Sequence, residues 1–479
     1  MKTLLQIVRG VATGLVSAAE VLEASIARIE ASDAKVNAFT GRSFARARAE
    51  AAAIDSRLAR GEVLPPLAGV PYAVKNLFDI EGVVTLAGSK INRREAPALQ
   101  DAFLVERMKA AGAVLVGGLN MDEYAYGFTT ENTHYGACHN PHDLTRIAGG
   151  SSGGSGAAVA AGQVPLTLGS DTNGSIRVPA SLCGVWGLKP TFGRLSRRGS
   201  YPFVHSIDHL GPFADSIEGL ALAYDALQSP DPLDPGCHAA QIQPVAPDMP
   251  RGVTGLRIGV LGGYFHEHAG PDARDVVARA ARALNAAAGL DAASAASSFL
   301  PRSAVKEVIW PDAALARAAA FIISACEGGN LHLADLRSRV EDFEPLSVDR
   351  FVSGVMQPAA WYLRAQRFRR SYREAVNALF NDWDVLLAPA TPVHAPVIGT
   401  EWIEINGARH PCRPAMGLLT QPVSLAGCPV VAAPMWPAGT GGMPIAVQVI
   451  TAPWREDVAF RAAWVLQQAG VAHTKSVEF

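Results

Sequence analysis

The sequence has few cysteines, no long apolar run and no excess of either charge. Its six cysteines are scattered along 479 residues without a C-x-x-C pair, which argues against a disulfide framework or a zinc site and predicts buried free thiols. No uncharged apolar run is long enough to span a membrane. The N-terminal apolar residues are interrupted by Arg9, Glu20 and Glu23, which disfavours a signal peptide. We therefore expect a cytoplasmic protein with no membrane partner.

The balance of charge argues against a nucleic-acid partner. The chain has 42 Lys and Arg against 44 Asp and Glu, a net charge of −2, and so offers no field to attract a polyanion. Length alone suggests two or three domains, but no repeat and no long polar linker divides the chain. We predict one domain over 1–479, with a helical region at 1–62, a core at 63–225 and the remaining sheet and covering helices at 251–479.

Apolar periodicity predicts helices that alternate with short strands. The N-terminal region has helical spacing, and "ARARAEAAAIDSRLARGE" is typical of an Ala/Arg/Glu helix. Short apolar runs in "GVPYAVK", "AVLVGG", "LTLGSD" and "RIGVLGG" predict strands. The alternation predicts an α/β fold whose sheet is covered by helices on both faces. Residues 228–250 are typical of a loop-rich insert, and the Ala/Ser-rich stretch 286–298 of a helix end or a loop.

Glycine and serine dominate the stretch "RIAGGSSGGSGAAVAAG" at 146–162. A flexible linker is disfavoured because a small-residue helix, "GAAVAAG", follows at once. A Walker-type phosphate loop requires Lys-Ser or Lys-Thr after the glycines, and neither is present. Residues 149–153 fit G-x-S-x-G, but a nucleophile elbow follows a strand and needs later Asp and His partners. The preceding "NPHDLTRIAGG" is instead typical of a turn, which leaves the elbow as an alternative.

Two other segments supply residues that could act with this loop. Lys75 lies in the apolar stretch "GVPYAVKNLFDI", where burial would disfavour its ammonium form, lower its pKa and make the amine a competent base. A second Gly-Ser turn, Gly174-Ser175, lies in "GSDTNGSIRVPASLCGVWGLKPT". Singly, Lys75 could be a surface lysine and each serine a loop or helix-cap residue. Together, a buried lysine with Ser151 and Ser175 could form a proton relay that needs no histidine.

With these flanks the chain resembles the amidase signature family over nearly its whole length, most strongly over 67–212. The similarity runs through "GVPYAVKNLFDI", "NMDEYAYGFTTEN", "GGSSGGSGAAVAAG" and the Ser175 segment. The resemblance implies a mixed central sheet covered by α-helices on both faces, with no cofactor and no metal. By position, it implies that Lys75 is the general base, Ser151 the bridging serine and Ser175 the acyl-forming nucleophile. It also implies a cis peptide bond between Gly150 and Ser151.

The implied reaction is amide hydrolysis through an acyl-enzyme. Neutral Lys75 would take the proton of Ser151 while Ser151 takes that of Ser175, which attacks the amide carbon. The oxyanion hole would consist of backbone N–H groups from Thr172, Asn173, Gly174 and Ser175. Asn173 stands where the family usually has glycine, so its side chain could narrow or polarise the pocket.

The resemblance also bears on the substrate. In a glutamine-hydrolysing branch of the family, one arginine binds the substrate carboxylate. By position, that arginine matches Arg369 in "YLRAQRFR". That branch holds the substrate ammonium with an acidic residue at the position of Gly417, so a free amino group would enter an apolar pocket unpaired here. A small acid with an amide and no amine is therefore implied. Tyr126 and His209 are further candidates for substrate binding, with a packing or structural role as the alternative for each.

A second branch is similar through "SRRGSYPFVHSIDHLGP", "PLSVDRFVSGV" and "CRPAMGLLTQPVSLAGCPVV". Its members act in bacterial cyanuric acid degradation, where they deaminate 1-carboxybiuret, a carboxylate with a terminal urea-type amide. They work with a small helical accessory subunit, as a dimer of such pairs. The resemblance implies the same substrate class and the same kind of partner for this chain. The alternatives are the glutamine-hydrolysing component of a tRNA-dependent amidotransferase, another small-acid amidase, and a non-catalytic scaffold that kept the fold.

Overall fold

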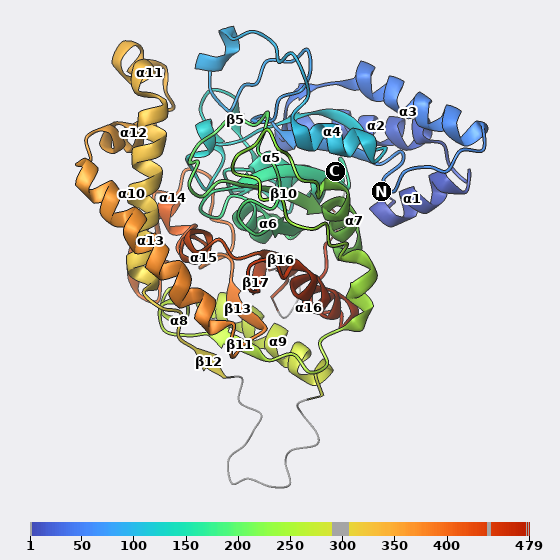
Figure 1. Cartoon of the computed structure of the whole chain (residues 1–479). Coiled ribbons are helices and arrows are strands. Elements are labelled where there is room, and N and C mark those ends of the chain that lie inside the picture. Colours follow the sequence, from blue (N-terminus) through green and yellow to red (C-terminus); the bar gives the residue numbers. More distant parts are fainter. Residues whose placement is uncertain (1, 290–305, 438–441, 476, 478) are drawn as a thin grey trace.

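The chain is organised around one 11-stranded sheet (Figure 1). The computed structural model describes residues 2–289, 306–437, 442–475, 477 and 479. In sheet order the strands are β1 (Phe39–Arg42), β3 (Val114–Leu119), β2 (Pro71–Lys75), β8 (Leu166–Asp171), β10 (His209–Ala214), β9 (Trp186–Lys189), β16 (Val430–Met435), β17 (Ile445–Ile450), β13 (Val385–Pro389), β11 (Ile258–Leu261) and β12 (Glu307–Val308).

The sheet is mixed, as the resemblance implied. β2 pairs in parallel with β3 and β8, whereas β10 is antiparallel to both β8 and β9. Farther along the sheet, β17 is antiparallel to β16 and β13, and β11 is parallel to β13 and β12. Every residue of β2, β3, β8, β16 and β17 is buried, so both faces of the sheet are covered there, as predicted.

The N-terminal region is mainly helical, which confirms the prediction for most of it. α1 (Leu4–Ala12), α2 (Ala18–Val36) and α3 (Phe44–Ala59) are its helices, and the first two begin with capping boxes at Thr3 and Ser17. The helical prediction is wrong between α2 and α3, where β1 pairs with β3 at the edge of the sheet. Four residues are too few to show a period, so the pairing with β3 decides their structure.

Most of the remaining helices cover the sheet, and a group of them packs together at one side of the molecule. They are α4 (Phe103–Ala110), α5 (Gly153–Ala160), α6 (Arg177–Cys183), α7 (Ile217–Leu227), α8 (Tyr264–Glu267), α9 (Pro271–Ala287), α10 (Ala313–Leu331), α11 (Leu333–Ser338), α12 (Val348–Val355), α13 (Ala359–Leu379), α14 (Cys412–Ala415), α15 (Gln421–Ala426) and α16 (Glu456–Gln468). α10 packs against α12, α13 and α15, and Figure 1 shows α10, α12 and α13 together in orange and gold, at the side away from the N-terminal helices.

Short elements complete the described chain. The 3-10 helices are η1 (Ile91–Arg94), η2 (Glu123–Ala125), η3 (Ala246–Arg251) and η4 (Val340–Asp342). The two-stranded sheets pair β4 (Glu131–Asn132) with β5 (Gly136–Ala137), β6 (His139–Asn140) with β7 (Asp143–Ile147), and β14 (Trp402–Ile405) with β15 (Ala408–Pro411).

Several local predictions can be compared with these bounds. The four predicted strands are confirmed as β2, β3, β8 and β11. The insert at 228–250 has no regular element before η3, and the Ala/Ser-rich stretch begins in the last turn of α9 and continues outside the described residues. All six cysteines are free, but Cys237 and Cys326 are only partly buried. Among the helices that the structure describes, none has the length and apolarity needed to cross a lipid bilayer.

Candidate active site

Lys75 ends strand β2 in the interior of the sheet, between β3 and β8. Its Nζ lies 2.7 Å from Ser151 Oγ and 2.8 Å from Ser170 Oγ, and the side chain is fully buried. Burial lowers the pKa of Lys75 to about 7, although nearby carboxylates, above all Asp122, oppose this shift. Near neutral pH a large share of this amine is therefore uncharged and able to accept a proton.

Ser151 lies in the glycine-rich loop before α5, where the chain packs too closely for larger residues. The peptide bond between Gly150 and Ser151 is cis, as expected. A Cβ on Gly150 would lie 2.1 Å from Asp122 Oδ2, and a Cβ on Gly154 would lie 2.6 Å from the backbone nitrogen of Asn120. The Asp122 N–H donates to the Ser151 carbonyl at 3.2 Å. This buried, tightly packed loop is no flexible linker, and its glycines provide the room for a close approach of backbone to Asp122.

Ser175 lies on the turn between β8 and α6, which a buried ion pair holds in place. Arg177 Nε and Nη2 each lie 2.9 Å from an oxygen of the Asp171 carboxylate, and both side chains are fully buried. The same carboxylate accepts from the Ile176 N–H at 3.2 Å. Because Asp171 precedes the turn and Arg177 follows it, this bidentate pair joins the two ends of the segment that carries Ser175.

The predicted oxyanion residues lie on that same turn. Within the described part of the chain, none of the backbone N–H groups of residues 172–175 donates a hydrogen bond to a protein acceptor. Gly174 has a φ of +140°, and a Cβ there would lie 2.1 Å from Thr420 Oγ1, so glycine is required. Asn173 is held from two sides, because its carbonyl accepts from Thr420 Oγ1 at 2.7 Å and its Nδ2 donates to Ser324 Oγ at 2.8 Å.

Ser175 borders a narrow cavity of about 30 Å³. Its aromatic walls are Tyr126, Phe128, Phe203 and Phe321. Its polar lining beside Ser175 comes from Thr172, Asn173, Ser324, Arg350 and Gln421. The polar groups beside Ser175 suit a polar substrate better than a long acyl chain.

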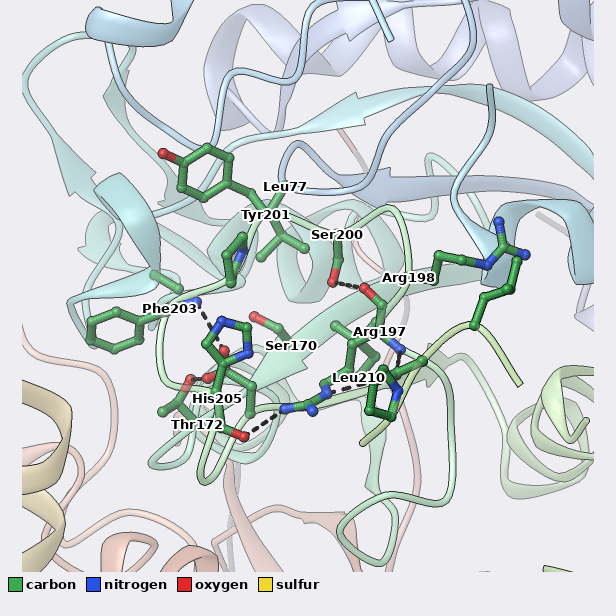
Figure 2. Close-up of a pocket in the computed structure, with 16 residues that line it drawn as sticks. Leu77, Ser170, Thr172, Arg197, Arg198, Ser200, Tyr201, Phe203, His205 and Leu210 are labelled. Carbon is green, nitrogen blue, oxygen red and sulfur yellow. Dashed lines mark hydrogen bonds and ion pairs between the residues drawn. The ribbon is translucent and has the colours of Figure 1, made fainter. Parts of the chain in front are cut away.

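A larger cavity of about 190 Å³ lies beside the Ser175 cavity and shares Ala125, Thr172 and Phe203 with it (Figure 2). Figure 2 shows Ser170 and Thr172 among its lining residues, with His205 and Arg197 beside them. The Arg197 side chain donates to the His205 carbonyl at 2.8 Å. Because Ser170 Oγ also contacts Lys75 Nζ, this cavity reaches the amine through a single hydroxyl.

The structure brings together some of the predicted relay residues directly. Lys75 and Ser151 are in hydrogen-bond contact, and Ser175 lies five residues beyond Ser170, the second hydroxyl that contacts the amine. The hydroxyls of Ser151 and Ser175 do not share a hydrogen bond, although both residues are described. The transfer of a proton from Ser175 to Ser151 therefore stays a prediction.

The three candidate substrate residues lie in different places. Tyr126 lines the Ser175 cavity. His209 is buried at the start of β10, where Nδ1 lies 2.7 Å from the Ile207 carbonyl oxygen and Nε2 lies 3.2 Å from Lys189 Nζ, and it does not line that cavity. Arg369 lies in a separate surface hollow on α13, and its guanidinium donates to the Ser206 carbonyl.

Sequence reasoning missed two polar residues of this region, Ser170 and Arg350. Ser170 precedes the Ser175 turn by a few residues, so its proximity to the relay could have been inferred from the parallel pairing of β2 with β8. Arg350 lies on α12, far away in sequence, in the segment "PLSVDRFVSGV", which carries part of the resemblance but in which no site residue was predicted. Only the tertiary structure brings it to the cavity of Ser175.

A buried amine that contacts a serine, with a second serine on a turn that has free N–H groups, is consistent with amide hydrolysis through an acyl-enzyme. A sequence profile of the Amidase family matches residues 20–459, and the chain belongs to that family. It is accordingly a hydrolase that acts on amide C–N bonds.

Similar proteins extend over nearly the whole chain. The chain is 70% identical over 475 residues to AtzE of Pseudomonas sp. (strain ADP), a component of 1-carboxybiuret hydrolase, covering 99% of this chain and 100% of that protein. It is 40% identical to the corresponding component of the Glutamyl-tRNA(Gln) amidotransferase of Anaeromyxobacter sp. (strain K), covering 96% and 94%. A solved structure of an s-triazine catabolic enzyme, described as a vestigial protein complex, matches with a TM-score of 0.94 at 69% identity, covering 99% of this chain and 100% of that one.

Proposed function

We propose that this chain is the catalytic subunit of an enzyme that hydrolyses the terminal amide of 1-carboxybiuret to urea-1,3-dicarboxylate and ammonia. The observation that carries the proposal is the full-length 70% identity to a component of 1-carboxybiuret hydrolase. It is supported by the buried contact between Lys75 and Ser151 beside a small cavity that Ser175 borders.

The proposed reaction begins with the neutral amine of Lys75. It takes the proton of Ser151 as Ser151 takes that of Ser175, and Ser175 Oγ forms a bond to the amide carbon. The negative charge that develops on the amide oxygen is bound by backbone N–H groups of the turn at 172–175. The relay then returns the proton to the amide nitrogen, the C–N bond breaks and ammonia leaves. Water attacks the resulting ester of Ser175, which releases the carboxylate product and restores the hydroxyl.

The surroundings of Gly417 argue against glutamine as the substrate. A Cβ at this position would lie 2.4 Å from the ring of Phe128, which lines the Ser175 cavity. The aromatic ring therefore occupies the space that an acidic side chain would need. Without an acidic side chain at position 417, an α-ammonium group would lose the partner expected there, and burying it unpaired is costly. This supports a substrate with a carboxylate and an amide but without an amine.

An accessory subunit is the second part of the proposal. Exposed apolar side chains occur along α12 and α13, at Val352, Val355, Met356, Trp361 and Leu363, and we refer to them as the 352–363 apolar face. Exposed apolar clusters of this kind commonly mark protein interfaces. We propose that a small helical partner covers this face. Two pairs, each of one chain and one partner, would form a heterotetramer. We further propose that this assembly acts in the cytoplasm in s-triazine and cyanuric acid breakdown.

A substrate panel tests the proposed function. The purified full-length chain, with any partner that co-purifies, is given 1-carboxybiuret, biuret, allophanate, malonamate or glutamine, and ammonia release is measured. We expect the highest kcat/KM with 1-carboxybiuret and no release from any substrate with the Ser175→Ala variant. Glutamine hydrolysis at a comparable rate would favour the amidotransferase alternative, and full activity of Ser175→Ala would contradict the proposal.

A further inference from the structure

We propose that a cavity next to the catalytic one binds small carboxylate anions and captures an acid substrate before it reaches Ser175. His268, which directly follows α8, Arg317 of α10 and His410 of β15 line this cavity. We refer to these three side chains as the outer basic cluster. The role in substrate capture rests on the proposed function, whereas the binding of a carboxylate does not.

The lining of this cavity offers an anion no acidic neighbour. The cavity has a volume of about 200 Å³, and besides the outer basic cluster it is lined by Tyr264, Ala314, Pro411, Pro414, Ala415 and Leu418. None of these described residues is acidic, although Glu267 is exposed beside His268. The Tyr264 hydroxyl already donates to the Leu418 carbonyl at 3.1 Å. The basic side chains are therefore the groups that remain for a polar ligand.

Most hydrogen-bond donors of the outer basic cluster are not used by the protein. Arg317 donates from Nε to Gln421 Oε1 at 3.0 Å, and in the part of the chain that the structure describes its two terminal nitrogens have no acceptor and no ion pair. The rings of His268 and His410 have centres 6.1 Å apart, and neither ring forms a hydrogen bond with another described residue. A guanidinium presents a fork of N–H groups and an imidazole at least one N–H. The cluster can therefore hold both oxygens of a carboxylate.

The three basic groups are close enough to act on one another. Burial lowers the pKa of His268, and the positive charges of His410 and Arg317 lower it further, against the opposing effect of Glu267. A bound anion would offset this repulsion between like charges. A cavity lined by one sign of charge also raises the local concentration of ions of the opposite sign. These properties suit a site that collects carboxylates from solution.

Two features connect the outer basic cluster to the Ser175 cavity. Pro414 lines both cavities. Gln421, which accepts from Arg317, also lines the Ser175 cavity, as does Phe321, one turn after Arg317 on α10. An acid held by the cluster is therefore next to the catalytic cavity. This position favours a role in substrate capture over one unrelated to the reaction.

Nuclear magnetic resonance of the histidine rings tests the anion site without any turnover. Malonate and malonamide share a carbon skeleton, but malonate carries two carboxylates where malonamide carries two amides. In the full-length chain with histidine labelled at Cε1, we expect malonate to shift the resonances of His268 and His410 until the site is saturated. Malonamide should shift neither. His142 is the reference ring and should not respond, because its Nε2 lies 3.0 Å from the Cys183 carbonyl oxygen, outside this cavity.

Arginine variants complete the titration. Arg317→Met should raise the malonate concentration at half saturation roughly 3- to 10-fold, as expected for loss of one hydrogen bond at a partly exposed site. Arg317→Lys should restore part of the affinity, because the charge returns without the fork. Arg370→Met removes a highly exposed arginine from α13 and should leave the titration unchanged. No saturable shift, an equal shift with malonamide, or unaltered affinity in Arg317→Met overturns the anion site.

Kinetics with 1-carboxybiuret test the role in capture. The double variant His268→Gln/His410→Gln leaves the contact between Arg317 and Gln421 in place. We expect it to lower kcat/KM roughly 3- to 10-fold, mainly through a higher KM, because the groups act before the chemical step. An unaltered kcat/KM, or a fall in kcat alone, overturns the capture role. Failure of the chain to hydrolyse 1-carboxybiuret would overturn the proposed function alone, since the malonate titration does not depend on that reaction.

Discussion

At the scale of single residues, we predict that the buried amine of Lys75 sets the pH dependence of the proposed reaction. Burial lowers its pKa from the ordinary value to about 7, so the neutral base is the main form only above that pH. We predict that kcat/KM rises about tenfold per pH unit below 7 and levels off above it. The measurement is a rate profile between about pH 5.5 and 9 with a substrate whose carboxylate stays ionised throughout. A profile that is flat across pH 7 would show that the neutral amine of Lys75 is not the base in the rate-determining step.

Ser170 offers a second test at this scale, because it contacts the same amine without belonging to the predicted relay. Ser170→Ala would leave an N–H of Lys75 buried without a partner, so we predict a roughly 10- to 100-fold fall in kcat. Ser151→Ala and Ser175→Ala should each lower kcat by at least ~10³-fold, because each removes a step of the reaction.

The matched control for these serine variants is Ser25→Ala. Ser25 is also buried and donates to the Gln163 carbonyl at 2.6 Å, but it lies on α2 outside both cavities. This change should lower stability without lowering kcat. If Ser170→Ala behaved like Ser25→Ala, the contact between Ser170 and Lys75 would have no part in catalysis.

The structure brings together those predicted residues that lie in short segments with distinctive neighbours. Lys75 and Ser151 stand within short segments whose neighbours are distinctive, and the structure places their side chains in contact. Arg350 could not be found in this way, because its position depends on how α12 packs against the loop that carries Tyr126. His209 has a distinctive neighbourhood as well, but its ring contacts Lys189 and backbone carbonyls rather than the cavity.

At the scale of elements, the turn between β8 and α6 depends on the buried pair of Asp171 and Arg177. Arg177→Met would leave the Asp171 carboxylate buried and unpaired, for which we predict a loss of about 3–5 kcal/mol in the free energy of unfolding. Urea-induced unfolding monitored by circular dichroism measures it. Arg48→Met is the matched control, since the ion pair of Arg48 and Glu23 is exposed to solvent and should contribute far less to stability. Equal losses for the two variants would contradict the argument.

The elements themselves could be predicted in part. Strands with continuous apolar runs, such as β3 and β8, stand out because both of their faces are buried. β1 was missed because it is short and lies beside two long helices, and its strand structure depends on pairing with β3. The order of strands in the sheet depends on contacts between segments distant in sequence, which no local pattern encodes.

At the scale of the whole molecule, the two halves of the sheet meet where β9 pairs with β16. Strands from residues 39–214 lie on one side of this pairing and strands from 258–450 on the other. We predict that the chain unfolds as one unit, as expected for the single domain over 1–479. Urea unfolding followed by circular dichroism and by tryptophan fluorescence should give coincident transitions. Two separate transitions would indicate that each half folds by itself.

The 352–363 apolar face lies partly on α12, the helix that also contributes to the cavity of Ser175. α12 buries Phe351 against the ring of Tyr126, with ring centres 5.0 Å apart, while Val352 and Val355 of the same helix are only partly covered, at 36% and 39% exposure. The same helix carries Arg350, which lines the cavity of Ser175, so a partner bound to these exposed residues would contact an element of the site. We therefore expect a partner to cover the face in the active enzyme. In the purified chain without a partner, we expect the face to promote self-association.

The last prediction follows from that exposure. Met356 is 77% exposed and Trp361 is 52% exposed, so the double variant Met356→Ser/Trp361→Ser removes much apolar surface without disturbing the core. We predict that the chain without its partner self-associates with rising concentration, and that this variant lowers its average mass in light scattering. The control is Leu99→Ser, which removes an equally apolar side chain that is 93% exposed elsewhere on the surface and should change nothing. If the double variant associates like the unaltered chain, the 352–363 apolar face is not an interface, which would contradict its proposed role in binding a helical partner.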